Sequence, residues 1–262
     1  MGFYDLDKRE RATLVETIRR DLQEAFRSTD LVPVILYFSD GDTYIRKSAY
    51  LGCGRIYFST EELQQPLLET LNRLAVHPDD RVRQTVVNAA GEIGKKDFAI
   101  VRAFFDKGLF DQGHIVRNAV IGSVKKMSEV NPVPVLEWAQ GYLHHPDKEI
   151  RREICHGIEL RGRTHPADIL PLLQQLEWDA TARVRNTLVH VIGQIAYKKG
   201  CLEQVAAALQ TWENRKLVTQ ALAEIVSVHE RYRNFAALSQ EEARAYLARA
   251  FAAEHYLPGG AV

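Results

Sequence analysis

The chain has 262 residues, of which 46% are hydrophobic and 26% are charged, which is ordinary for a folded globular protein. Its 34 basic and 34 acidic side chains cancel to a formal net charge of zero, so the whole molecule has no electrostatic bias toward nucleic acid. No apolar run reaches the roughly 20 residues of a membrane-spanning helix, and the early charges are unlike a secretory signal. The three cysteines lack the spacing of a disulfide framework or a thiolate zinc site. We therefore expect a cytoplasmic protein with no membrane association.

The first elements are predicted to be helices. Residues 5–28 carry an apolar stripe at helical spacing that includes Leu14, Ile18 and Leu22, and we expect residues 1–28 to form an N-terminal capping helix. Residues 29–44 read as a second helix followed by a turn. Gly52 and Gly54 are expected to make the end of the next helix irregular, with a short loop running through Phe58.

A repeated pattern occupies residues 29–235. An aliphatic residue followed by Arg occurs five times, and the arginines are Arg46, Arg83, Arg117, Arg151 and Arg185. Their spacings are 37, 34, 34 and 34 residues, and each copy places apolar residues one before and three, four and seven after the Arg. Each copy also has an amphipathic segment upstream, and a weaker sixth copy surrounds Leu217. This period predicts stacked helix pairs.

The C-terminal segment is expected to close the array. Ser239 and Glu242 form a capping-box pattern, which predicts a last helix over residues 239–256 and a frayed tail over 257–262. The predicted fold is therefore all-α: a right-handed α-α superhelix of about six HEAT-like helix pairs with helical caps. We expect one continuous domain over residues 1–262.

Aspartates accompany the repeated arginines. Asp lies four residues before the Arg in three copies and six residues before it, as Asp111 and Asp179, in the other two. Such positions suit a helix start. We predict a structural ladder in which each Arg pairs with the Asp of its own or the next repeat, naming Asp79 and Asp147 as members. Phosphate contacts by the arginines are the alternative.

A polar strip is predicted on the second helix of each pair, at positions one, five and nine after the Arg. Its members are Gln84, Asn88, Glu92, Asn118, Lys126, Arg152, His156, Asn186, His190 and Gln194. In such arrays these helices usually line the concave side, so the strip is the candidate binding surface; plain solvated helix faces are the alternative. A candidate basic rim consists of Lys125, Arg161, Arg163, Lys198 and Lys199, although basic residues also favour helix C-termini on electrostatic grounds alone.

Catalytic motifs are absent. The chain has no Gly-rich phosphate loop, no Gly-x-Ser-x-Gly and no His-Glu-x-x-His. The neighbours His144 and His145 lack a matching third ligand, and the side chains of Cys155 and His156 diverge on a helix. We expect no catalytic residue, no cofactor and no metal.

From Trp138 to Trp212 the chain resembles the helical-repeat DNA alkylation repair proteins, the AlkC/AlkD-type DNA glycosylases. The resemblance is carried by Leu136–Ala139, by Ile150–Gly157 and by Val184–Ala196, with Gln112–Arg117 matching a further motif. It implies a HEAT-like fold and a DNA partner. The family's acidic positions fall on Gly113, His156 and Gln194, and its aromatic falls near Thr164, so the resemblance implies a divergent member that lacks the catalytic acids.

Three functions follow from these observations. The leading hypothesis is a non-catalytic binding protein whose concave surface holds DNA. The first alternative is a protein–protein interaction scaffold with no role in nucleic acid, which the zero net charge favours. The second alternative is an active alkylpurine DNA glycosylase that uses residues other than those matched above.

Overall fold

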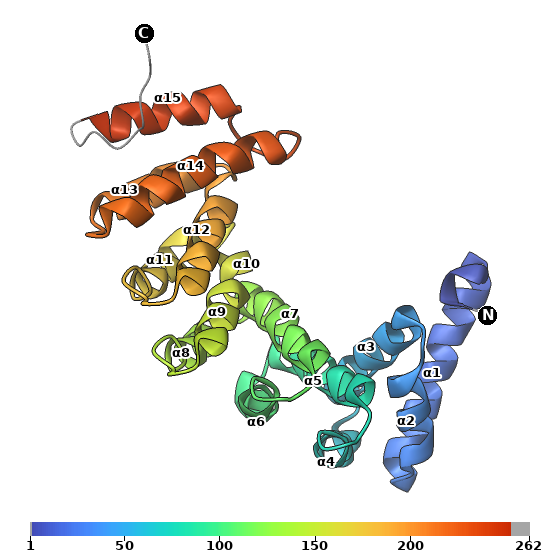
Figure 1. Cartoon of the computed structure of the whole chain (residues 1–262). Helices are drawn as coiled ribbons and strands as arrows, with labels where there is room; N and C mark the ends of the chain where they lie inside the picture. Colours follow the sequence, from blue (N-terminus) through green and yellow to red (C-terminus); the bar gives the residue numbers. More distant parts are fainter. Residues whose placement is uncertain (1, 253–262) are drawn as a thin grey trace. The chain divides into compact units, whose positions relative to one another are not determined.

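A computed structural model describes residues 2–252, and every regular element within this range is a helix (Figure 1). The chain divides into two compact units, Met1–Asn131 and Pro132–Val262. Each unit is a stack of helical hairpins. No helix of the described range is long and apolar enough to cross a membrane.

The first unit contains a cap and three helix pairs. Its helices are a 3-10 turn at Phe3–Asp5, α1 at Lys8–Ser28, α2 at Leu31–Ser39, α3 at Thr43–Ser59, a 3-10 turn at Glu61–Leu63, α4 at Gln64–Leu74, α5 at Asp80–Gly94, α6 at Phe98–Gly108 and α7 at His114–Val130. The second helices of the pairs lie side by side, with α5 packed between α3 and α7. Helix α1 covers the end of this row by packing on α3.

The second unit also contains three pairs and a terminal helix. Its helices are α8 at Pro132–Gln140, α9 at Lys148–Gly157, α10 at Glu159–Gly162, α11 at Pro166–Gln174, α12 at Ala182–Ala196, α13 at Cys201–Gln210, α14 at Arg215–Arg231 and α15 at Gln240–Ala250. Helix α12 packs between α9 and α14, and α15 covers α13 and α14.

Local sequence explains where these helices begin. Asp42, Asp79 and Asp147 are the N-cap residues of α3, α5 and α9, and each side chain accepts a hydrogen bond from the backbone N–H two residues later. Such a bond satisfies one of the free donors of a helix start. The capping box of Ser239 and Glu242 is formed as predicted.

The repeated apolar positions form the core. In α5, Val82, Val86 and Ala90 are each at most 1% exposed, and the matching residues of α12 are equally buried. A single hairpin cannot bury such a face, and stacking against its neighbours does so. The prediction of an all-α, HEAT-like array of about six helix pairs with a helix at each end is therefore confirmed.

Helix α3 is longer and more regular than the sequence predicted. The irregular end around Gly52 and Gly54 and the loop through Phe58 are wrong, because α3 runs unbroken to Ser59. A Cβ on Gly54 would lie 2.7 Å from the Cβ of Glu92, so this glycine permits close packing of α3 on α5 and does not break the helix.

The tail at 257–262, and residues 253–256 of the expected last helix, lie outside the described residues. The single domain over residues 1–262 stays a prediction.

Candidate functional site

The repeated arginines have one contact in common. In all five copies Nη1 donates to the backbone carbonyl six residues earlier, as Arg83 does to His77 at 2.7 Å and Arg151 to His145 at 2.7 Å. Each Arg therefore holds the loop that precedes its own helix. This contact is structural and was not anticipated from the sequence.

Two of the arginines also pair with the next repeat. Arg83 meets Asp111 through two bonds, Nε to Oδ2 at 2.8 Å and Nη2 to Oδ1 at 2.9 Å. Arg151 meets Asp179 in the same way, at 2.5 and 3.0 Å. Such two-point pairs fix geometry as well as charge, so the ladder exists at these two steps.

The ladder's acidic members differ from those named in the sequence analysis. Asp79 and Asp147 cap their helices, and Asp79 pairs with Arg81 rather than with Arg83. The ion-pair partners are the aspartates that lie six residues before the next Arg. Accepting a backbone N–H does not prevent the pairing, because Asp111 and Asp179 also accept one two residues later; what differs is that these two lie in the loops that meet the Arg of the preceding repeat.

The ion pairs shift the pKa values of both partners. The Arg83 guanidinium lowers the pKa of Asp111. For Asp179 burial acts in the opposite direction, but hydrogen bonds from Arg151 and from the Thr181 N–H outweigh it, and the pKa is lowered. Both aspartates are therefore held in the charged form, as a structural pair requires.

In the first unit the polar strip comprises Gln84, Asn88, Glu92, Asn118 and Lys126, and all five are at least partly exposed. Glu92 pairs with Lys95 at 2.6 Å, Gln84 donates to the carbonyl of Ile115 at 3.4 Å, and Lys126 lies over the ring of Tyr50. The paired Glu92 leaves this part of the strip with mixed charge.

In the second unit the strip borders a hollow of about 450 Å³ between α9 and α12. Its lining residues are Arg152, His156, Arg183, Asn186, Thr187 and His190. All six side chains can donate a hydrogen bond, and four of them were predicted to form the strip. The structure thus brings together Arg152, His156, Asn186 and His190.

Gln194 does not belong to this surface. It is 1% exposed, and its Oε1 accepts from Arg163 Nη2 at 2.9 Å. Arg163 in turn contacts Oε1 of Glu159, which is also 1% exposed. The prediction that Gln194 forms part of an accessible strip is wrong, because the end of α12 is buried on every side and position nine turns inward with it.

The predicted basic rim is largely engaged within the protein. Arg161 pairs with Asp168, Arg163 is held by Glu159 and Gln194, and Lys198 lies over the ring of Tyr197. Lys199 is exposed, and Lys125 of the first unit is partly exposed. Positive charge that is paired in this way attracts a phosphate backbone weakly, because the neighbouring carboxylates cancel its field.

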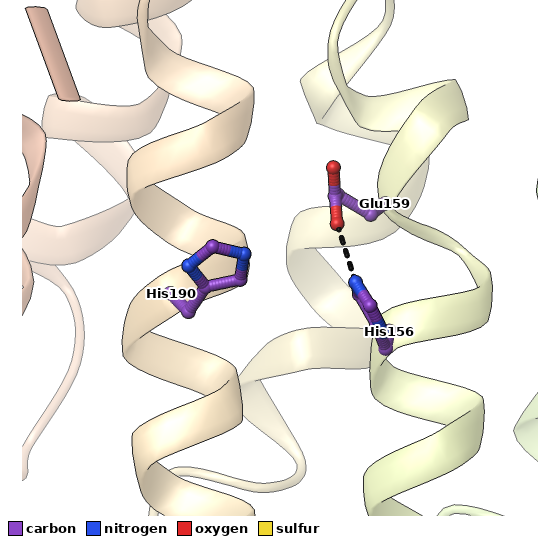
Figure 2. Close-up of side chains that lie close together, drawn as sticks. All are labelled: His156, Glu159 and His190. Carbon is purple, nitrogen blue, oxygen red and sulfur yellow. Dashed lines mark ion pairs between the residues drawn. The ribbon is translucent and has the colours of Figure 1, made fainter. Parts of the chain in front are cut away.

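Two histidines of the polar strip also approach a buried carboxylate. His156 from α9, Glu159 from α10 and His190 from α12 turn toward one another (Figure 2). His156 Nε2 is 3.1 Å from Glu159 Oε2, and the potential ligand atoms of the three residues lie within 4.8 Å of one another. Sequence reasoning missed Glu159, which falls eight residues after its Arg and outside the chosen positions. It also missed Arg183 and Thr187, which line the hollow from α12.

The fold and this surface define a HEAT-like repeat protein with a polar hollow between two second helices. No family model matches the chain, and no curated protein matches it. Among solved structures, Escherichia coli YibA is 16% identical, with a TM-score of 0.45 over 95% of this chain and 89% of that one. A HEAT-like repeats protein from Thermococcus onnurineus NA1 is 14% identical, with a TM-score of 0.40 over 91% and 97%.

A designed armadillo repeat protein in complex with the peptide (KR)4 is 16% identical, with a TM-score of 0.29 over 95% of this chain and 96% of that one. Because these identities and scores are low, the similarities say nothing about function. The relationship to the AlkC/AlkD-type glycosylases stays a prediction.

Proposed function

We propose that the chain is a non-catalytic binding scaffold that holds an acidic, extended segment of a protein partner in the hollow between α9 and α12. The observation that carries this proposal is the lining, which offers six hydrogen-bond donors and no carboxylate. An extended peptide presents backbone carbonyls and, where acidic, carboxylates, and both are acceptors that such a lining suits.

The charge around the hollow favours an acidic peptide over the phosphate backbone of DNA. Glu149 pairs with Arg152 at 2.9 Å and with Arg183 at 3.3 Å, so one carboxylate offsets part of two positive charges. Duplex DNA binding draws its affinity from many phosphate contacts by uncompensated cations. A short acidic segment needs only one or two such contacts.

DNA is the second candidate. Arg183 and Asn186 are exposed on α12, and both side-chain types commonly contact phosphate oxygens. This arrangement, together with the resemblance described above, supports a DNA partner that the polar surface would hold without base excision.

The test compares three labelled ligands by fluorescence anisotropy: a Glu/Asp-rich peptide, a Lys-rich peptide of equal length and duplex DNA. We expect the acidic peptide to bind and Arg183→Ala to weaken it by about tenfold, as loss of a charge-assisted bond predicts. Arg102→Ala is the matched control, because Arg102 is 62% exposed and Arg183 is 64% exposed, and each faces a carboxylate.

Equal loss in the two variants would overturn the proposal, as would a preference for the Lys-rich peptide. Tighter binding of duplex DNA, with an affinity that falls steeply as salt rises, would replace the protein partner with DNA. Absence of binding to the acidic peptide rejects the proposal as stated.

A further inference from the structure

The cluster of His156, Glu159 and His190 supports an inference beyond partner binding. We propose that these three residues form a mononuclear transition-metal site, with Zn²⁺ as the ion that it fits best. Two imidazole nitrogens and one carboxylate oxygen are ligands that zinc takes in proteins, with a further position left to water or another ligand. The proposal stands independently of the peptide partner.

The donor geometry is close to what a metal requires. Zinc bonds to nitrogen and oxygen are about 2.0–2.2 Å long, so neighbouring ligand atoms of a tetrahedral site lie about 3.4 Å apart. His156 Nε2 and Glu159 Oε2 form an ion pair at 3.1 Å, so a small widening would bring them to that separation. His190 completes the set within 4.8 Å, and since its side chain is 43% exposed it has room to close the remaining distance by a small rotation.

The backbone brings these residues together from three helices. Helix α9 ends at Gly157 and α10 begins at Glu159, with Ile158 between them still in the right-handed helical region. His156 and Glu159 are therefore three residues apart on one helical face, and α10 packs on α12. The third ligand, His190, projects from α12 into the same space (Figure 2).

Outer partners orient the ligands, as they do around most metal centres. Oε1 of Glu159 is taken by Arg163, while Oε2 faces His156. On the other side, Nδ1 of His190 lies 3.7 Å from Oε1 of Glu224 on α14. At 3.7 Å the contact is an ion-pair distance and not a hydrogen bond, and a carboxylate behind a ligating histidine makes its other nitrogen a better ligand.

Close helix packing puts Glu224 in that position. A Cβ on Gly193 would lie 2.7 Å from Cγ of Glu224, so only glycine lets α14 approach α12 this closely. The residue three positions after His190 thereby brings the outer carboxylate to the cluster. Glu224 also pairs with Arg231 at 3.4 Å.

The cationic side chains near the cluster are each paired with a carboxylate. Arg163 contacts Oε1 of Glu159, and Arg152 and Arg183 share Glu149. Since His156 and His190 also line the hollow, a bound ion would have one side open to it. The ligand set favours zinc, and Cu²⁺ and Ni²⁺ are the ions expected to compete at nitrogen-rich sites.

The test is a titration of the metal-stripped full chain with Zn²⁺ by calorimetry. We expect one ion per chain and a rise in the unfolding temperature on binding. His156→Ala and His190→Ala should each weaken binding by more than about 100-fold, and Glu224→Gln by about 10–100-fold, the range of an outer partner. His144→Ala is the matched control, since His144 is an exposed histidine of the same unit outside the cluster.

Circular dichroism of every variant establishes that it folds, and Co²⁺ in place of Zn²⁺ gives a visible spectrum that reports nitrogen and oxygen ligation. Absence of saturable binding by the folded wild-type chain would overturn the proposal. So would wild-type affinity in both His156→Ala and His190→Ala, or equal loss in His144→Ala. Peptide binding measured in a chelating buffer tests the proposed function separately.

Discussion

The ion pair between Arg151 and Asp179 offers the sharpest test of how successive repeats are joined. Asp179→Asn keeps the shape of the side chain and removes its charge. The Asp179 side chain is 4% exposed and the Arg151 side chain is 13% exposed, so the substitution leaves a largely buried guanidinium without its counter-charge. Arg151 retains its bonds to the carbonyls of His145 and Pro146.

The size of the effect follows from this burial. Removing one partner of a fully buried pair costs about 3–5 kcal/mol. Because Arg151 is partly exposed and keeps two carbonyl acceptors, we expect Asp179→Asn to lower the free energy of unfolding by about 2–3 kcal/mol. The control is Asp79→Asn: Asn is an equally good N-cap, and the lost pair with Arg81 is exposed, so the cost should stay below about 1 kcal/mol.

Acid should erase the difference between wild type and Asp179→Asn. Burial alone would raise the folded-state pKa of Asp179, but hydrogen bonds from Arg151 and the Thr181 N–H together outweigh it and the pKa is lowered. The stability that this carboxylate contributes is complete above the pKa of the same aspartate in the unfolded chain and is lost as pH falls through the lower folded-state pKa.

Urea unfolding followed by circular dichroism measures these effects, with Arg151→Met completing a double-mutant cycle. We expect a coupling energy of at least about 1 kcal/mol, within the range for contacting residues. A coupling below about 0.5 kcal/mol, or a loss in Asp79→Asn as large as that in Asp179→Asn, would refute the role assigned to the ladder.

Two further predictions concern packing and thiol chemistry. Gly162→Ala should destabilise the protein by about 1–3 kcal/mol, because the added methyl would overlap Ile169. Gly122→Ala has open space around it and should stabilise α7 by about 0.5–1 kcal/mol. Equal unfolding midpoints of the two variants would contradict this. Burial raises the pKa of Cys53 to about 12 and also raises that of Cys155, so both should react with a thiol reagent only after unfolding; rapid labelling of the native protein would contradict their burial.

The fold could be predicted because every repeat has to bury an apolar helix face, and this face appears in the sequence at the same spacing in each copy. Val82 and Val184 occupy the same apolar position and are both buried, so one pattern explains every second helix. The aspartates show the limit of this reasoning. Asp79 and Asp111 both favour a helix start, and only the three-dimensional packing decides which of them meets Arg83.

The candidate site was only partly predictable for a similar reason. The strip rule found His156 and His190 because both point away from the apolar face. It placed Gln194 with them, although this side chain is buried, and it left out Glu159, which lies three residues after His156. Helical periodicity gives the direction of a side chain but not the burial at the end of a helix, and a spacing of four alone omits the neighbours that lie three residues away.

The two interrepeat ion pairs also constrain how the chain can change in length. Arg83 and Asp111 are 28 residues apart, and so are Arg151 and Asp179. An insertion or deletion between them would shift the second hairpin against the first and separate the paired side chains, so each ion pair restricts the length of the segment between its two residues. The residue 28 positions after Arg46 is Leu74, and this is the copy whose spacing to the next Arg is 37 rather than 34. We therefore expect extra residues to be tolerated in the first repeat, but not between Arg83 and Asp111 or between Arg151 and Asp179.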